Sequence, residues 1–567
     1  MAHLRRRLAS FIPALFCAAC AAAGPNAGPA LYEGDNNAVT IFTGGVIYTG
    51  LDDAPTAEAV AVSHGVIAAV GDRKLVEDSA GAGAIVINLK GAAMYPGFTD
   101  AHGHLLGIGM RELTLNLEGV ASIDALVLTV AAKAQDTEDS ETIYGRGWIE
   151  TGWPEGRMPN RIDLDPVSRN NPVVLIRADG HAMVVNSAAL DAVGIDDDTP
   201  DPDGGRIERD QFGRATGILI DRAQALMQPL LAAPDEAKKR EAYIMASKVY
   251  AAYGWTGIHS MSVAPDNVAI MEDLSQAGDL DLRVYNSIDA SGLDALAESG
   301  PRASANGRIV TRAIKLYMDG ALGSRGALLS EPYSDRPEIS GLLLMQKDDA
   351  AALFDSALAA GVQVNTHAIG DEANKLLLDW YEEAFARNPD AGDLRWRDEH
   401  TQILHVEDIP RFAELGVIPS MQASHAIGDL FFAPDRLGPD RLDGAYAWRA
   451  LIDAGSIIAG GTDAPVERGD PRIEFYAAVA RRGLDGTQNQ DWRPGQAVTR
   501  AEALKMFTIW PAYASFQEDL LGTIEPGKRA DFTVFSKDIM TIPAADILTV
   551  ETVMTVIDGE IAFQAGN

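Results

Sequence analysis

Cysteine is nearly absent from this chain of 567 residues, which has only Cys17 and Cys20. The rest of the sequence therefore has neither disulfides nor thiolate chemistry available to it. Basic residues are also few, with 47 Lys and Arg against 81 Asp and Glu, and the net charge is −34. Nucleic acid is excluded as an expected partner, because its phosphates require a basic surface.

The longest apolar stretch lies near the N-terminus, from Leu8 to Ala23, directly after three arginines. It is shorter than the roughly 20 residues that a membrane-spanning helix needs. Its order of basic, apolar and small residues is typical of a secretory signal. We expect residues 1–23 to be a signal peptide, and the mature protein to be periplasmic or secreted, with no membrane-spanning segment.

Two cleavage sites are open for this signal. Cys17-Ala-Ala-Cys20 resembles a bacterial lipoprotein box, in which Cys20 would carry a lipid anchor, although that box normally has Leu where Cys17 stands. Cleavage after Ala23 is the alternative, and a single acyl chain would anchor the protein only weakly. Residues 24–38, rich in Gly, Pro, Asn and Ala, predict a linker.

The body of the chain contains two kinds of sequence pattern. Residues 39–90 and 515–567 contain short β-branched runs separated by turn residues, which predict a small composite β-sandwich domain built from both chain ends. Residues 91–514 alternate short apolar runs with longer Ala-, Leu- and Glu-rich stretches, as in a parallel α/β core. Because eight such units need about 250 residues, we predict a (β/α)8 TIM barrel with an insertion at 110–235, where the sequence is polar and turn-rich.

Histidine is scarce as well, with 10 residues, yet His102 and His104 stand one residue apart in YPGFTDAHGH. Residues 92–98 predict the first barrel strand, and alternation along an extended chain puts both imidazoles on one side. Imidazole is a common ligand for Zn²⁺, and the active sites of such barrels lie at the C-terminal ends of the strands. The pair is therefore a candidate part of a metal site.

Four later segments end predicted strands with residues that could complete this site, namely Lys315, His367, His400 and Asp463. His405 competes with His400, and we favour His400 because residues 401–404 continue away from the strand end. Lys315 lies inside an apolar run, where an ammonium group is poorly solvated. A modified lysine fits this position, and an ordinary ion-paired lysine is the alternative.

In this order along the chain, these residues resemble the amidohydrolase superfamily. The amino-acid sequences of the individual motifs narrow the resemblance to the YtcJ-like branch, which includes N-substituted formamide deformylases. The resemblance runs from about residue 40 to the end and is carried by PGFTDAHGHL, GRGW at 145–148, GHAMVVNSAAL at 180–190, KLYMDGALGSRGA at 315–327, THAIGDEA at 366–373, EHTQILHVEDIPRFAELGV at 399–417, SMQASHA at 420–426, GGTDAPVE at 460–467 and GTIEPGKRADFTV at 522–534.

The resemblance implies one or two divalent metal ions, with Zn²⁺ the first choice. By the family pattern, His102, His104 and Asp463 hold one ion, His367 and His400 hold the other, and a carbamylated Lys315 bridges them. The ions would activate water and polarise a carbonyl. The pattern further implies catalytic residues, namely Asp463 as general base and then acid, and His181 and His425 in substrate contact or oxyanion stabilisation. For these last two histidines, a bond to a backbone carbonyl is the alternative.

We therefore expect an exported metal-dependent hydrolase that cleaves a non-peptide C–N bond in a small amide-type substrate, for example an N-substituted formamide. An esterase, lactonase or phosphoesterase with the same metal site is one alternative, because activated water attacks any electrophilic carbonyl or phosphorus. A non-catalytic exported binding protein of the same fold is another. Asp463 argues against that reading, because a binder needs no proton shuttle. A homo-oligomer is compatible with the sequence.

Overall fold

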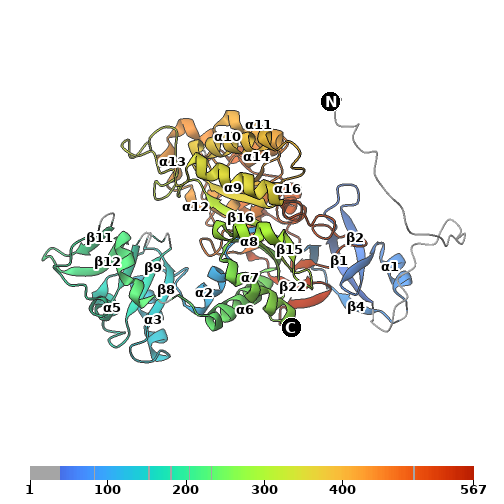
Figure 1. Ribbon diagram of the computed structural model, residues 1–567. Coiled ribbons are helices and arrows are strands. Elements are labelled where there is room, and N and C mark those ends of the chain that lie inside the picture. Colours follow the sequence, from blue (N-terminus) through green and yellow to red (C-terminus); the bar gives the residue numbers. More distant parts are fainter. Residues whose placement is uncertain are drawn as a thin grey trace, which may run out of the picture.

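The computed structural model describes residues 39–566 apart from 82, 151–152, 179, 181, 203–204, 232 and 489–491. The expected signal peptide, its Cys20 and the linker lie outside this range. Figure 1 shows three parts: an inserted unit on the left with strands β8, β9, β11 and β12, a central barrel, and N-terminal strands β1, β2 and β4 on the right. No helix among the described residues is long and apolar enough to cross a membrane.

The central part is a parallel barrel whose eight strands lie in sequence order. The last strand returns to the first, where the N–H groups of Thr462 and Asp463 donate to the His102 carbonyl at 3.2 and 2.6 Å. The predicted TIM barrel is thereby confirmed. Its strands are β6 (Phe98–Gly103), β13 (Trp255–Val263), β14 (Arg283–Asp289), β16 (Ile309–Tyr317), β17 (Gln363–Ala368), β18 (Arg397–His400), β19 (Ile418–Gln422) and β20 (Ala459–Gly461).

The closure of the barrel depends on a glycine and a buried carboxylate. A Cβ on Gly461 would lie 2.4 Å from the backbone nitrogen of His102, so a larger residue would push β20 away from β6. Asp100 Oδ1 accepts from the N–H groups of His102 and Thr462 at 3.0 and 2.9 Å. Its Oδ2 accepts from the hydroxyls of Tyr250 and Thr462 at 2.9 and 2.7 Å. Asp100 thus ties the first strand, the last strand and a covering helix together.

The prediction that residues 92–98 form the first barrel strand is wrong. Strand β5 (Ala93–Pro96) pairs with β21 (Phe532–Phe535) in the composite sheet, and the barrel begins only at Phe98. Gly97 separates the two strands and donates its N–H to the Asp531 carbonyl at 2.8 Å. A Cβ on Gly97 would lie 2.3 Å from Thr256 Oγ1. The chain therefore passes from the composite sheet to the barrel at Pro-Gly. In the sequence, this pair lies inside one apolar run.

Helices follow the barrel strands and cover the outside of the barrel (Figure 1). Their buried faces share one large apolar core with the strands. The longer ones are α6 (Glu236–Tyr253), α7 (Pro265–Ala277), α9 (Lys347–Ala360), α10 (Asp371–Arg387) and α15 (Pro471–Ala480). The shorter ones are α8 (Leu293–Ser299), α11 (Ile409–Leu415), α12 (Ala423–Asp429), α13 (Ala433–Leu437), α14 (Trp448–Asp453), α16 (Arg500–Met506) and α17 (Ile509–Ala514).

Strands from both chain ends form one composite domain, as expected, and belong to one continuous eight-stranded sheet. The reason is that β21 bonds to β5 on one side and to β22 on the other, which leaves no break between the two ends. Phe42 and Phe532 meet in the shared core with ring centroids 5.4 Å apart. The other members are β1 (Thr40–Tyr48), β2 (Thr56–Ser63), β3 (Val66–Gly71), β4 (Ile85–Asn88), β22 (Thr552–Ile557) and β23 (Glu560–Gln564), with α1 (Arg73–Ala80) alongside.

The inserted unit is a six-stranded sheet with helices, although its sequence is polar and turn-rich. It begins after α2 (Leu105–Leu113) and ends before α6. These two helices touch, since a Cβ on Gly109 would lie 1.8 Å from the Ala242 carbonyl oxygen. The chain thus leaves and re-enters the barrel at one place. The unit contains β7 (Leu115–Asn116), α3 (Ile123–Gln135), β8 (Ile143–Trp148), α4 (Arg161–Leu164), β9 (Val173–Arg177), β10 (Ala182–Val185), α5 (Ser187–Val193), β11 (Gly205–Arg209) and β12 (Ala215–Asp221).

A buried ion pair joins the barrel to the composite sheet. Arg283 of β14 contacts Asp531 with Nε–Oδ2 and Nη2–Oδ1 distances of 2.5 and 3.0 Å. We expect Asp531→Ala to lower the free energy of unfolding by about 3 kcal/mol, because Arg283 would lose its main partner. Chemical denaturation measures this change. In the control Asp78→Ala, which removes an exposed pair with Lys74, stability should stay unchanged. Equal effects of the two substitutions would contradict the prediction.

Candidate metal centre

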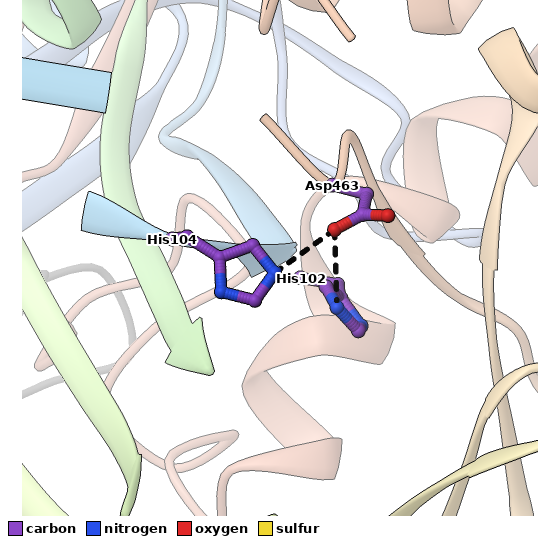
Figure 2. A group of neighbouring side chains, drawn as sticks. All are labelled: His102, His104 and Asp463. Atoms are coloured by element: carbon purple, nitrogen blue, oxygen red, sulfur yellow. Dashed lines mark hydrogen bonds and ion pairs between the residues drawn. The ribbon is translucent and has the colours of Figure 1, made fainter. Parts of the chain in front are cut away.

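Imidazole rings from three strand ends gather at the C-terminal end of the barrel. The His102 ring centroid lies 5.6 Å from that of His104 and 4.7 Å from that of His400, and the His367 and His400 centroids are 4.5 Å apart. Asp463 Oδ1 lies 3.0 Å from His104 Nε2 and 3.5 Å from His102 Nε2. Figure 2 shows both rings directed at this carboxylate. The structure thus brings together residues that are far apart in sequence.

Lys315 and His425 also lie at this centre. Lys315 is buried in β16, with its Nζ 5.5 Å from the ring centroid of the neighbouring Tyr317. His425 lies in α12, and its Nε2 is 3.6 Å from Asp463 Oδ2. His181 lies outside the described residues. His405, the alternative to His400, precedes the 3-10 helix η3 (Val406–Asp408) and is only partly buried, whereas His400 stacks among the other rings.

Left-handed backbone conformations occur at non-glycine residues around the centre, among them Ser262, His400 and Asp463, with φ of 54°, 80° and 58°. Such conformations are rare for residues with a side chain and gather at functional sites. His400 shows the consequence. It follows Glu399 directly, and regular alternation would put the two side chains on opposite faces of β18. The positive φ at His400 lets both side chains face the interior.

Three of the rings that face the centre are held from behind by an acceptor. His102 Nδ1 lies 2.5 Å from Glu399 Oε2, His104 Nδ1 lies 3.2 Å from the Met261 carbonyl, and His400 Nδ1 lies 2.8 Å from Gln422 Oε1. A neutral imidazole that donates through Nδ1 has its lone pair on Nε2. The Nε2 atoms of His102 and His400 are therefore available as ligands, and that of His104 faces the Asp463 carboxylate at 3.0 Å.

Burial keeps the rings of His102, His367 and His400 neutral. It lowers the pKa of His102 to about 4 and that of His367 to about 3, and the charge of Lys315 acts in the same direction. Burial also lowers the pKa of His400 well below its usual range. The pKa of Lys315 itself falls to about 8, chiefly by burial. The centre thus holds lone pairs on neutral rings and an amine that loses its proton more easily than an exposed lysine does.

The donor set fits a divalent metal. Within the described part of the chain, the buried Nε2 atoms of His102 and His367 have no hydrogen-bond partner, a costly state for a polar atom unless an ion completes it. The ligand atoms of His102, His104 and Asp463 lie within 4.8 Å of one another, as do those of His400, His425 and Asp463. Nitrogen and carboxylate oxygen are ligands that Zn²⁺ accepts.

The sequence reasoning missed a buried network behind His102. Arg397 forms an ion pair with Glu399, with an Nε–Oε1 distance of 2.7 Å, and its Nη2 donates to Ser420 Oγ at 2.7 Å. Its Nη1 lies 2.8 Å from His259 Nδ1. Arg397 and Glu399 are fully buried, and Arg397 and His102 hold the pKa of the Glu399 carboxyl below its usual range despite its burial. The alternation of Arg397 and Glu399 just before His400 was the available signal.

Asp319, in the motif KLYMDG, was also missed. It is almost fully buried and accepts from the N–H groups of Leu328, Ile369 and Gly370 at 2.8, 3.0 and 2.8 Å. Burial raises its pKa to about 7. Its Oδ1 lies 3.5 Å from His367 Nε2. Asp319 thus fixes the loops after β16 and β17 next to one of the candidate ligands.

Known proteins resemble the chain over most of its length. It is 34% identical over 539 residues to YtcJ of Bacillus subtilis, whose name places it among the amidohydrolases; the match covers 92% of this chain and 99% of that protein. It is 29% identical over 525 residues to the N-substituted formamide deformylase of Arthrobacter pascens, covering 90% and 95%. The YtcJ-like resemblance read from the motifs is confirmed.

Solved structures and a family model agree with these relatives. The metal-dependent hydrolases of Pyrococcus horikoshii and Pyrococcus furiosus superpose with TM-scores of 0.74 and 0.72 at 26% and 30% identity, over 89% of this chain and 99% and 100% of theirs. The model described as the amidohydrolase family matches residues 85–563. The chain therefore belongs to the amidohydrolase family of metal-dependent hydrolases.

Proposed function

We propose that this hydrolase cleaves a C–N bond of a small amide-type compound, with N-substituted formamides as the first substrates to test. One observation carries the proposal: the Asp463 carboxylate faces the Nε2 atoms of two imidazoles, 3.0 Å from that of His104 and 3.5 Å from that of His102. The same centre therefore offers metal ligands and a proton acceptor. The deformylase relative supports the choice of substrate.

The residues of this centre would have two roles, namely binding a metal ion and transferring a proton. His102, His104, His367, His400 and Asp463 would hold the metal, most simply Zn²⁺, which supplies Lewis-acid catalysis and lowers the pKa of water. Asp463 accepts a proton from the attacking water. It then returns that proton to the leaving nitrogen, which would otherwise depart as a poor anion. Cleavage of an amide needs this second transfer more than cleavage of an ester does.

A turnover screen of the metal-loaded protein tests this function. The substrates are N-substituted formamides, acyl amino acids, cyclic imides, lactones and phosphoesters, and Asp463→Asn serves as the blank. We expect the largest kcat/KM on an amide-type compound. Turnover confined to lactones or phosphoesters would replace the proposal with an esterase or phosphoesterase. Binding of these compounds without any turnover would favour a binding protein.

Lys315 should carry a carbamate when metal is bound. Its lowered pKa makes the neutral amine accessible; the nitrogen then forms a bond to CO₂ and releases a proton. The product places two oxygens among the histidines. We expect Lys315→Ala to bind less metal and added acetate to restore part of it, with Lys505→Ala as a control at an exposed ion pair. An unmodified Lys315 in a crystal of the fully loaded protein would disprove the carbamate.

Export is the second part of the proposal and rests on residues 1–23. We expect the protein to be recovered outside the cytoplasm with its N-terminus at Cys20 or Gly24. Cell fractionation followed by N-terminal sequencing measures both. A lipidated Cys20 would distinguish the lipoprotein route from cleavage after Ala23. Recovery of cytoplasmic protein that begins at Met1 would contradict export.

A further inference from the structure

His425 is held differently from the three rings that have acceptors behind them. Its Nδ1 lies 3.1 Å from Gln402 Nε2, which belongs to an amide NH₂ group and can only donate. The Nδ1 atom must therefore accept, and the proton of the neutral ring then resides on Nε2. The ring thus offers an N–H group to the centre where His102 and His400 offer lone pairs.

The Nε2–H of His425 points into the centre and is otherwise unused. His425 is 8% exposed, and its Nε2 has no hydrogen-bond partner among the described residues. The nearest carboxylate oxygens are Asp463 Oδ2 at 3.6 Å and Glu467 Oε1 at 4.0 Å, both beyond a good hydrogen bond. Proximity alone would allow His425 as a metal ligand, because its ring lies near His400 and Asp463. The proton on Nε2 argues against that role.

The helix that carries His425 is fixed at its beginning, middle and end. At the start of α12, Glu474 Oε2 accepts from the Ser424 N–H at 3.0 Å. In the middle, the Ala426 carbonyl accepts from Trp492 Nε1 at 2.7 Å. At the end, Asp429 accepts from the Tyr446 hydroxyl. These buried contacts give the ring of His425 a fixed place, as preorganised hydrogen-bond donors in active sites require.

We propose that His425 binds the substrate carbonyl oxygen through Nε2–H, and that Gln402 is the positioning residue that fixes this tautomer. The inference rests on the proposed hydrolysis, in which negative charge develops on that oxygen. A donor that is in place before the reaction stabilises the charge without reorganisation. Gln402 acts only through His425, because its amide lies behind the ring.

Metal content tests the donor role without any substrate. We expect His425→Ala to bind as many Zn²⁺ ions as the parent protein, whereas His400→Ala binds fewer. Elemental analysis after dialysis against a dilute zinc buffer measures the stoichiometry. Loss of an ion from His425→Ala comparable to the loss from His400→Ala would make His425 a ligand and overturn the proposal.

The tautomer is measured by NMR on protein labelled with ¹⁵N-histidine, because protonated and unprotonated ring nitrogens differ in chemical shift. At a pH above the ordinary histidine pKa of about 6.5, we expect the proton of His425 on Nε2, with its signals assigned from their loss in His425→Ala. In Gln402→Leu or Gln402→Met the proton should distribute over both nitrogens. Gln496→Leu, at a glutamine that accepts from the Ala450 N–H, is the control.

A proton on Nδ1 in the parent protein, or an unchanged tautomer in both Gln402 variants, would overturn the proposal. Activity adds a further measurement. We expect Gln402→Leu and His425→Ala to lower kcat by about 100-fold each with little change in KM, and the double variant to be no worse than His425→Ala. If no amide is turned over while metal content and tautomer are as expected, the proposed function fails and the assignment of His425 as a donor stands.

Discussion

Asp463→Asn should lower kcat by about 10³-fold, within the range for loss of a general acid–base group. The carboxylate touches a candidate ligand, with Oδ1 3.0 Å from His104 Nε2, and can accept a proton there. An asparagine keeps the shape and one oxygen, but its amide cannot accept and return a proton. Steady-state kinetics on the best amide substrate, together with metal content, measures the effect.

His102→Ala is the matched comparison, because it should also abolish turnover but through loss of metal. Removing a ligand ring should weaken metal affinity by at least about 100-fold, since even residues behind a ligand cost 10 to 100-fold. Metal content therefore separates the two variants. Near-normal rates in both would show that the reaction takes place elsewhere, and equal metal loss in both would reduce Asp463 to a ligand.

Glu399→Ala should damage both stability and metal binding. Arg397 would be left as a buried charge without its carboxylate, which costs about 3–5 kcal/mol in the free energy of unfolding. His102 would lose the acceptor for Nδ1, so that its tautomer and orientation are no longer fixed and metal affinity falls by about 10 to 100-fold. Thermal denaturation of the metal-free protein and zinc titration measure the two effects separately.

A paired substitution separates the two causes further. In Arg397→Met with Glu399→Leu, no unpaired charge remains, so stability should recover in part. Metal affinity should stay low, because His102 still lacks its acceptor. Glu399→Gln is the intermediate case, since its amide oxygen can accept from His102 without a charge. Full recovery of metal affinity in the paired variant would show that Glu399 acts on stability alone.

The barrel could be predicted, and the candidate ligands could be named, because both depend on local sequence patterns. His102, His367 and Asp463 each follow a short apolar run, and parallel strands bring their C-terminal ends to one place. The strands of the inserted unit were not predicted, because polar, turn-rich segments separate its short apolar runs, such as that of β9. The change of sheets at Gly97 could not be predicted either, because β5 and the start of β6 form one apolar run in the sequence.

The contacts behind the histidines could not be predicted, because they join residues that no pattern links. Glu399 reaches His102 from another strand, and Gln402 reaches His425 from beyond a barrel strand. The positive φ at His400 overrides the alternation on which a sequence argument depends. Whether a histidine is a hydrogen-bond donor or a ligand depends on these contacts. Its role can therefore be assigned only from the folded structure.

The continuous sheet built from both chain ends has a consequence for the timing of folding. Strand β5 is synthesised early, but its partner β21 is among the last strands to be made. Pairings between such distant segments form slowly, and unpaired strand edges are prone to aggregate. Until β21 has been made, the edge of β5 that pairs with it stays open, although the barrel strand that carries His102 begins two residues after β5 ends. The composite sheet can therefore be completed only after all the barrel strands have been synthesised.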